Sequence, residues 1–262
     1  MMKKIAVFGG VYNNYISLEA TIKDAKSRGA DAIYCLGDLG GFGPHPDRVF
    51  PILKEHDIPV IMGNYDHSVG NDLEDCGCGY TDPRDNYYAK ISYDYTHKYT
   101  SDSNKAWLRT LPTEIRTELG ENNILMVHGS PRKINEFLWE STTPEPFLEK
   151  LFNRYGADVI LCTHTGVHWE RTLPSGKKLI NVGAIGRPAN DGRTNVWYSF
   201  ITLTDWGEVK NEFIPIHYDY KRLAHELKEE NLPEEFITTL ETGYWTTCLE
   251  IMPRKERERG KY

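Results

Sequence analysis

Four short pieces of the sequence combine polar side chains with residues that usually end a strand. They are Gly37-Asp38, Gly63-Asn64-Tyr65-Asp66, His128-Gly129-Ser130-Pro131 and Thr163-His164-Thr165. Asp38, Asn64, His128 and His164 offer one carboxylate, one carboxamide oxygen and two imidazoles. A ligand set of oxygen and nitrogen atoms suits Mn²⁺, Fe²⁺ or Zn²⁺ better than Mg²⁺. Each piece alone is more often a turn, a cap or a core histidine, but the four together predict a divalent-metal site.

The elements that position these pieces alternate between strands and helices. Apolar runs at 4–8, 31–36 and 58–62 predict strands, and each ends on glycine and a polar or small residue. Helices are expected after Ser17, which resembles an N-cap, and over 46–56. This alternation is typical of an α/β sheet with its chemistry at the carboxyl ends of the strands.

The second half of the chain predicts further strands over 114–119, 123–128 and 159–162, with a helix over 146–155. Short alternating runs between Trp169 and Ile216 predict hairpins of a second sheet. The stretch 218–240 reads as helical and 254–261 as a solvated tail. In the segment 72–99, Tyr88, Ile91 and Tyr95 fall on one helical face, for which packing is a better interpretation than substrate stacking.

Composition limits the function classes. The chain has 262 residues and a formal net charge of −7, so a broad cationic face for duplex nucleic acid is not expected. No apolar run approaches the roughly 18 residues of a membrane span, and the first run is shorter than the about 7–15 residues of a signal peptide. We therefore expect a single domain over 1–262, with its core at about 3–216, in the cytoplasm. Five cysteines in such a chain predict reduced thiols.

Three motifs carry a family resemblance. They are L-G-D-L-G-G-F-G-P-H-P at 36–46, V-H-G-S-P at 127–131 and N-V-G-A-I-G-R-P at 181–188. Over about residues 3–216 the chain resembles the calcineurin-like metallophosphoesterases, and among them the small bacterial and archaeal phosphodiesterase/phosphatase branch. The resemblance implies an α/β (α+β) fold, a four-layer αββα sandwich of two mixed sheets flanked by helices. It also implies a two-metal site in which Asp38 bridges and Asn64, His128 and His164 bind the second ion.

The departures from the family pattern fall on the other ion. Gly10 stands where the family has an aspartate, Tyr12 where it has a histidine, and Gly166 where it has a second histidine. All private ligands of the first ion are thus absent. We expect a mononuclear site holding Mn, Fe or Zn, in which one ion and Asp38 keep a modest positive charge.

The resemblance also implies roles for residues around the ion. Tyr65 replaces the histidine that serves as acid or phosphate ligand, and Asp66 matches the aspartate that orients it. A phenol with an ordinary pKa near 10 donates hydrogen bonds but shuttles protons poorly at neutral pH. Arg187 or Arg132 could supply a fixed cation for phosphate oxygens, and an ion pair is the alternative reading of each.

A rebuilt second metal site is a further alternative. His168, Cys76 and Cys78 are the candidate ligands, and thiolates among them would favour zinc or iron. In the competing interpretation, His168 faces away from the site and the two cysteines form a turn.

Three functions remain open on these residues. The first is a metal-dependent phosphoesterase that hydrolyses a phosphomonoester or phosphodiester, with a small phosphorylated substrate. The second is an inactive protein of the same fold that binds a ligand or serves as a scaffold. The third is another metal-dependent chemistry on this fold. The segments 72–99 and 135–146 are expected to shape access to the site.

Overall fold

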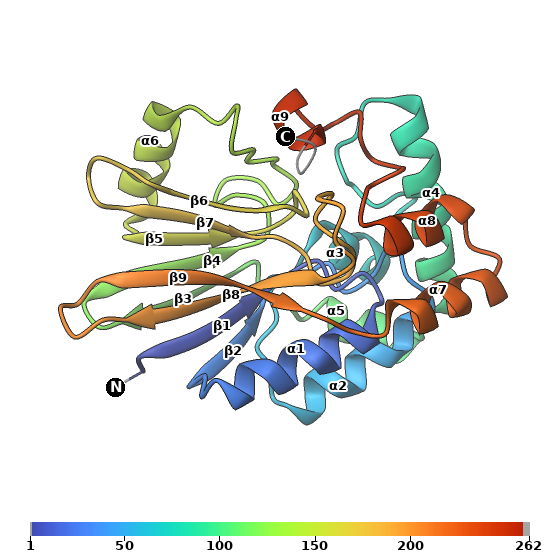
Figure 1. Ribbon diagram of the computed structural model, residues 1–262, viewed down its shortest axis with the longest axis horizontal. Helices are drawn as coiled ribbons and strands as arrows, with labels where there is room; N and C mark the ends of the chain where they lie inside the picture. The colour runs from blue at the N-terminus through green and yellow to red at the C-terminus, as the bar shows by residue number, and fades with distance from the viewer. Residues whose placement is uncertain (1, 259–262) are drawn as a thin grey trace.

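The computed structural model describes residues 2–258. Two mixed β-sheets pack face to face, and helices lie outside them, as Figure 1 shows. The predicted four-layer αββα sandwich is therefore confirmed. Between the two sheets lies a core of aliphatic side chains from both of them, including Ile5, Val7, Leu161 and Val182, all of them fully buried.

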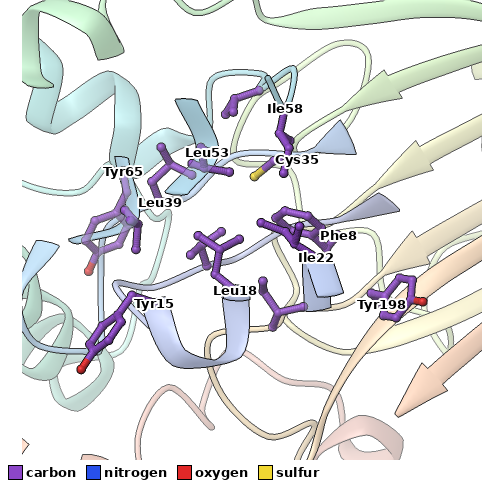
Figure 2. Packing of buried hydrophobic residues seen from close by; sticks show 14 of the residues in the cluster. Phe8, Tyr15, Leu18, Ile22, Cys35, Leu39, Leu53, Ile58, Tyr65 and Tyr198 are labelled. Carbon is purple, nitrogen blue, oxygen red and sulfur yellow. The ribbon is translucent and has the colours of Figure 1, made fainter. Parts of the chain in front are cut away.

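The first sheet has the strand order β2-β1-β8-β9. Its strands are β1 (Lys4–Phe8), β2 (Ala32–Cys35), β8 (Val196–Leu203) and β9 (Val209–Ile216). Helices α1 (Tyr15–Ser27) and α2 (Val49–Glu55) cover its outer face. Figure 2 shows Leu18 and Ile22 of α1 packed toward Phe8 and Cys35. The N-cap of α1 is Asn14, which accepts a 3.0 Å hydrogen bond from the Ser17 N–H, so Ser17 lies inside the helix.

The second sheet has the strand order β3-β4-β5-β7-β6. Its strands are β3 (Glu114–Leu119), β4 (Asn122–Val127), β5 (Val159–Cys162), β6 (His168–Thr172) and β7 (Lys178–Val182). Helix α6 (Glu145–Tyr155) covers the outer face with the buried side chains Leu148, Leu151 and Phe152. Strands β4, β5 and β7 run parallel, so their carboxyl ends meet at one edge.

Two expectations about strands were wrong. The hairpin β8–β9 belongs to the first sheet, because β8 pairs antiparallel with β1 with Ile5 opposite Ile201. The run 58–62 is no strand but a single bridge between Cys35 and Val60. Pro59 interrupts that run, and proline has no N–H to donate to a ladder.

A helical insertion follows β2 and α2 in the sequence. It contains α3 (Asn64–Gly70), α4 (Pro83–Tyr99) and α5 (Asp102–Leu108), while the short 3₁₀ turn η1 (Pro46–Arg48) precedes α2. We call residues 217–258 the C-terminal extension, which contains α7 (Tyr220–Glu229), α8 (Glu234–Thr242) and α9 (Arg254–Arg257). In Figure 1 the extension lies beside α4.

Hydrogen bonds tie the extension to the rest of the fold. Tyr88 and Tyr95 of α4 donate to Glu235 at 2.6 Å and Glu230 at 2.9 Å, so this tyrosine face serves packing. The stretch 254–257 is a helix rather than a loose tail, because Glu256 is only 3% exposed and accepts hydrogen bonds from Ser141. The remainder of the predicted tail lies outside the described residues. Within 2–258, no helix is both long and apolar enough to span a membrane.

Candidate metal centre

The loop after β2 and the start of α3 form one side of the site. Gly37, with φ +84°, crosses closely over Gly63, and the backbone there leaves no room for a side chain. The buried carboxylate of Asp66 accepts hydrogen bonds from the N–H groups of Asp38 at 2.7 Å, Leu39 at 2.9 Å and Gly63 at 2.8 Å. Asp66 therefore fastens the Asp38 loop to α3.

Three metal-ligating side chains converge at this point. Ligand atoms of Asp38, His128 and His164 all lie within 4.8 Å of one another, and all three residues are buried. Nε2 of His128 is 3.2 Å from Oδ2 of Asp38, and the two imidazole rings are 5.2 Å apart between centroids. Asp38 and His164 have positive φ angles of +54° and +65°. Left-handed backbone is uncommon for such residues and concentrates at functional sites.

The protonation of His164 suits a cation. Burial and, next, the neighbouring His128 together lower the pKa of His164 to about 3, so His164 is neutral at physiological pH. Burial raises the pKa of the Asp38 carboxyl, but the attraction of His128 outweighs it and holds the pKa below its usual value. Asp38 is therefore an anion facing two imidazoles.

Asn64 completes the set from the start of α3. Its amide nitrogen donates to the carbonyl oxygen of Cys76 at 2.9 Å, which directs Oδ1 the other way. Within the part of the chain that the structure describes, Oδ1 of Asn64, Nε2 of His128 and both ring nitrogens of His164 are buried and make no well-aligned hydrogen bond. Buried polar atoms are normally paired. One carboxylate, one amide oxygen and two imidazoles around such orphaned atoms fit a divalent cation.

Aromatic side chains occupy the neighbouring space. A Cβ on Gly10 would lie 2.7 Å from the Cβ of Ala184 and 2.8 Å from the ring of Tyr12. A Cβ on Gly166 would lie 2.9 Å from the indole of Trp245. The positions of the absent ligands are thus filled by packed rings, and nothing among the described residues rebuilds a second cation cluster there.

A cavity of about 50 Å³ opens beside the ligands. Asp38, Asn64 and His164 form one wall, and Tyr65 lies next to them. The insertion and the C-terminal extension form much of the rest, with the side chains of Tyr80, Tyr88, Ala89, Ser92, Phe236, Thr247 and Cys248. The 72–99 segment and the extension thus line this cavity, whereas none of the lining side chains comes from residues 135–146.

The predicted catalytic residues differ in placement. Tyr65 lines the cavity, and its hydroxyl lies 3.2 Å from Oγ of Ser92 and 3.4 Å from the carbonyl oxygen of Ala89. Burial raises its pKa well above the usual value, so the phenol stays neutral. Asp66 contacts backbone N–H groups, not the Tyr65 side chain. Its structural role is to position the loop, which differs from the expected orienting role.

The two arginines are in different surroundings. Arg187 lines the cavity, is 8% exposed and lies with its guanidinium carbon 3.4 Å from the centroid of the Trp245 ring. Arg132 forms an ion pair with Glu136 and covers the ring of Phe147 at 4.7 Å. The ion-pair alternative therefore applies to Arg132.

The proposed ligands of a rebuilt site are engaged elsewhere. His168 stacks against Trp197 and Phe213, each 4.7 Å away between centroids, and is outside the cation cluster. Cys76 and Cys78 form a disulfide, so the expectation of reduced thiols was wrong for this pair. Gly77 between them has φ +59°, a turn that brings the two sulfurs together. As a disulfide they offer no thiolate to a metal.

Sequence reasoning missed the contribution of the C-terminal extension. Trp245, Cys248 and Phe236 lie against the site but follow no motif and have no spacing relationship to the ligands. The one local signal is Gly243, typical of a helix end, which predicts a change of direction just before Trp245.

Comparison with known proteins agrees with this architecture. A model described as the calcineurin-like phosphoesterase superfamily domain matches residues 3–204. An uncharacterized protein of Methanocaldococcus jannaschii is 27% identical over 245 residues, which cover 88% of this chain and 94% of that protein. Within 2–258, the extension lies beyond the matched domain.

Two solved structures share the fold. A hypothetical protein from Pyrococcus horikoshii OT3 is 23% identical, with a TM-score of 0.76 and coverage of 93% of this chain and 99% of the other. A metallophosphoesterase from Sphaerobacter thermophilus is 24% identical, with a TM-score of 0.69 and coverage of 93% and 100%. Both resemble this chain beyond residue 204, so the likeness includes part of the extension.

Proposed function

Because the chain belongs to the calcineurin-like phosphoesterase superfamily, we propose that it is a metal-dependent phosphoesterase that uses one divalent cation. Its substrate is a small phosphomonoester or phosphodiester, and its location is the cytoplasm. The observation that carries the proposal is the group of orphaned buried atoms on Asn64, His128 and His164 beside the Asp38 carboxylate. Such atoms are costly to bury unless a ligand completes them.

The chain's own residues divide the work of the site. Asp38, Asn64, His128 and His164 would hold the cation, which when bound polarises phosphoryl oxygens and makes water more acidic. Tyr65 keeps its proton and supplies a hydroxyl at the cavity wall. The aromatic residues of the insertion and extension exclude bulk water, which strengthens electrostatic contacts inside.

A direct test combines metal content with hydrolysis. The protein is purified without chelator, its metal is quantified, and p-nitrophenyl phosphate and bis(p-nitrophenyl) phosphate are offered with Mn²⁺, Fe²⁺, Zn²⁺ and Mg²⁺. We expect about one equivalent of metal and turnover that Asp38→Asn abolishes. Asp205→Asn is the matched control, because the Asp205 side chain is 92% exposed. Two equivalents of metal in the wild-type protein would contradict the single-cation site.

A ligand-binding protein without turnover is the second candidate. It is favoured by the small size of the cavity, about 50 Å³, and by the rings that fill the space beside Gly10 and Gly166. Absence of hydrolysis with every metal, together with one bound cation and retained phosphate binding, would select this function over the first.

A further inference from the structure

Arg187 is a buried cation without a counter-ion. It follows β7 in the turn that contains Gly183 and Gly186, and only 8% of it is exposed. Its Nε has no hydrogen-bond partner, and within residues 2–258 no carboxylate pairs with it. The polar groups around it are the thiol of Cys248, with which it shares a hydrogen bond, and the phenols of Tyr12 and Tyr80. Burying a charge in this way is unfavourable unless a partner completes it.

Aromatic rings hold the guanidinium but do not satisfy it. Its carbon lies 3.4 Å from the centroid of Trp245, 5.6 Å from that of Tyr12 and 5.9 Å from that of Phe42. Cation–π contacts of this kind offset part of the desolvation cost. The rings offer no acceptor to the N–H groups at the edge of the guanidinium. Those N–H groups match the oxygens of a phosphate or carboxylate.

Trp245 comes from the C-terminal extension and is fixed to the same turn as Arg187. Its indole N–H donates to the carbonyl oxygen of Pro188 at 2.6 Å, and its backbone N–H donates to Oδ1 of Asn190 at 2.9 Å. The six-membered ring of the indole also fills the space beside Gly166. The ring therefore has little freedom, and the guanidinium stacked on it is held in place.

The charges of the cavity agree with an anionic ligand. Asp38 lies on the cation side of the same cavity. Once a divalent cation occupies the ligand set, the cavity has a net positive charge with Arg187 at one wall.

We propose that Arg187 is the oxyanion-binding residue of this cavity and that Trp245 is its positioning residue, so that the C-terminal extension completes the site. The ligand class is a phosphoryl group with its oxygens shared between the cation and the guanidinium. In naming a phosphoryl group, the inference rests on the proposed function.

The experiment measures the affinity for inorganic phosphate by calorimetry, with Mn²⁺-loaded and with chelator-treated protein. Arg187→Gln is expected to weaken binding about ten- to a hundredfold, as for loss of a charge-assisted hydrogen bond. Trp245→Leu should weaken it about five- to twentyfold, whereas Trp245→Phe should stay within about threefold because a ring remains. Arg132→Gln and Trp206→Leu are the matched controls, since Arg132 is paired with Glu136 and Trp206 is 93% exposed.

The outcomes separate this inference from the proposed function. Wild-type protein that binds no phosphate in either form, or Arg187→Gln with unchanged affinity, overturns it. If Trp245→Leu lowers the melting temperature but leaves phosphate affinity per folded molecule unchanged, the indole is only structural and the positioning role is wrong. If Trp245→Leu fails to fold, Trp245→Phe decides the question. A loss of phosphate affinity in Trp245→Phe as large as that in Arg187→Gln would contradict the positioning role of the ring. A wild-type protein that binds no metal or shows no turnover contradicts the proposed function. A phosphate affinity that depends on Arg187 would then still support the role of Arg187 in binding the oxyanion.

Discussion

The ring of His128 lies with Nδ1 2.6 Å from the carbonyl oxygen of Leu36. A carbonyl oxygen only accepts, so Nδ1 carries a proton, and Nε2 on the side of Asp38 is the ring nitrogen that could bind a cation. A backbone group that fixes the tautomer of a metal-binding histidine is a common second layer of support. The strand-to-loop transition after β2 thus both presents Asp38 and orients the imidazole opposite it.

The first prediction concerns this imidazole. His128→Gln removes Nε2, and we expect the affinity for Mn²⁺ or Zn²⁺ to fall at least about tenfold. His225→Gln is a suitable control, because the His225 side chain is 71% exposed and pairs with Glu229 on its own helix. Metal titration monitored by calorimetry measures both. Equal affinities in the two variants would exclude His128 as a ligand.

The second prediction concerns the disulfide. Because Cys76 and Cys78 are joined to each other, the double variant Cys76→Ser/Cys78→Ser should bind the same number of metal ions as the wild type. The carbonyl of Cys76, which holds the amide of Asn64, is retained in this variant. Elemental analysis after gel filtration gives the stoichiometry. A lower metal content would return the sulfurs to the ligand set.

The third prediction concerns the space of the absent ion. Gly166→His should not create a second metal site, because its Cβ would meet the indole of Trp245 at 2.9 Å and φ is +73°. In Gly166→His, the overpacked side chain should lower the free energy of unfolding by about 1–3 kcal/mol. The left-handed backbone should lower it by about 1–2 kcal/mol more. Gly176→His pays only the backbone part, since φ is +84° and nothing lies within 4 Å. Urea unfolding compares the two, and equal stabilities would show that the space is open.

The fourth prediction is a pH dependence away from the metal ligands. Burial raises the pKa of Glu136, but the hydrogen bonds from Arg132 and Ser130 outweigh it and leave the pKa below its ordinary 4.5. A lowered pKa in the folded state contributes stability above the unfolded pKa, and that contribution is lost as the pH falls through the folded value. The wild type should therefore lose unfolding free energy more steeply than Glu136→Gln on acidification below about pH 4.5. Urea denaturation at several pH values checks this, and parallel profiles would contradict it.

The sequence predicted the sandwich and the convergence of Asp38, His128 and His164, because both depend on local signals. A strand that ends on glycine and a polar residue, as β2 does before Gly37-Asp38, indicates where a functional loop leaves the sheet. The structure brings Asn64, His128 and His164 to the Asp38 loop, although their role as ligands remains a prediction.

What could not be predicted depends on contacts between distant parts of the chain. The sequence around Arg187 does not indicate that Trp245 stacks on it, because the tryptophan lies far along the chain, after a helix of the extension. The sheet to which β8 and β9 belong depends on the partner of β8, and a hairpin pattern is the same in either sheet. The pairing of Cys76 with Cys78 depends on the turn at Gly77, which composition does not reveal.

The position of Trp245 in the chain has a consequence for biosynthesis. All four proposed ligands, the last of them His164, precede it in the sequence, and domains generally fold from the N-terminus as they leave the ribosome. A nascent chain can therefore gather its metal ligands while the wall that carries Trp245 has not yet been translated. The cation centre would form before the anion-binding side of the cavity is complete. A chain that stops early would hold a metal at a site that lacks the Trp245 wall.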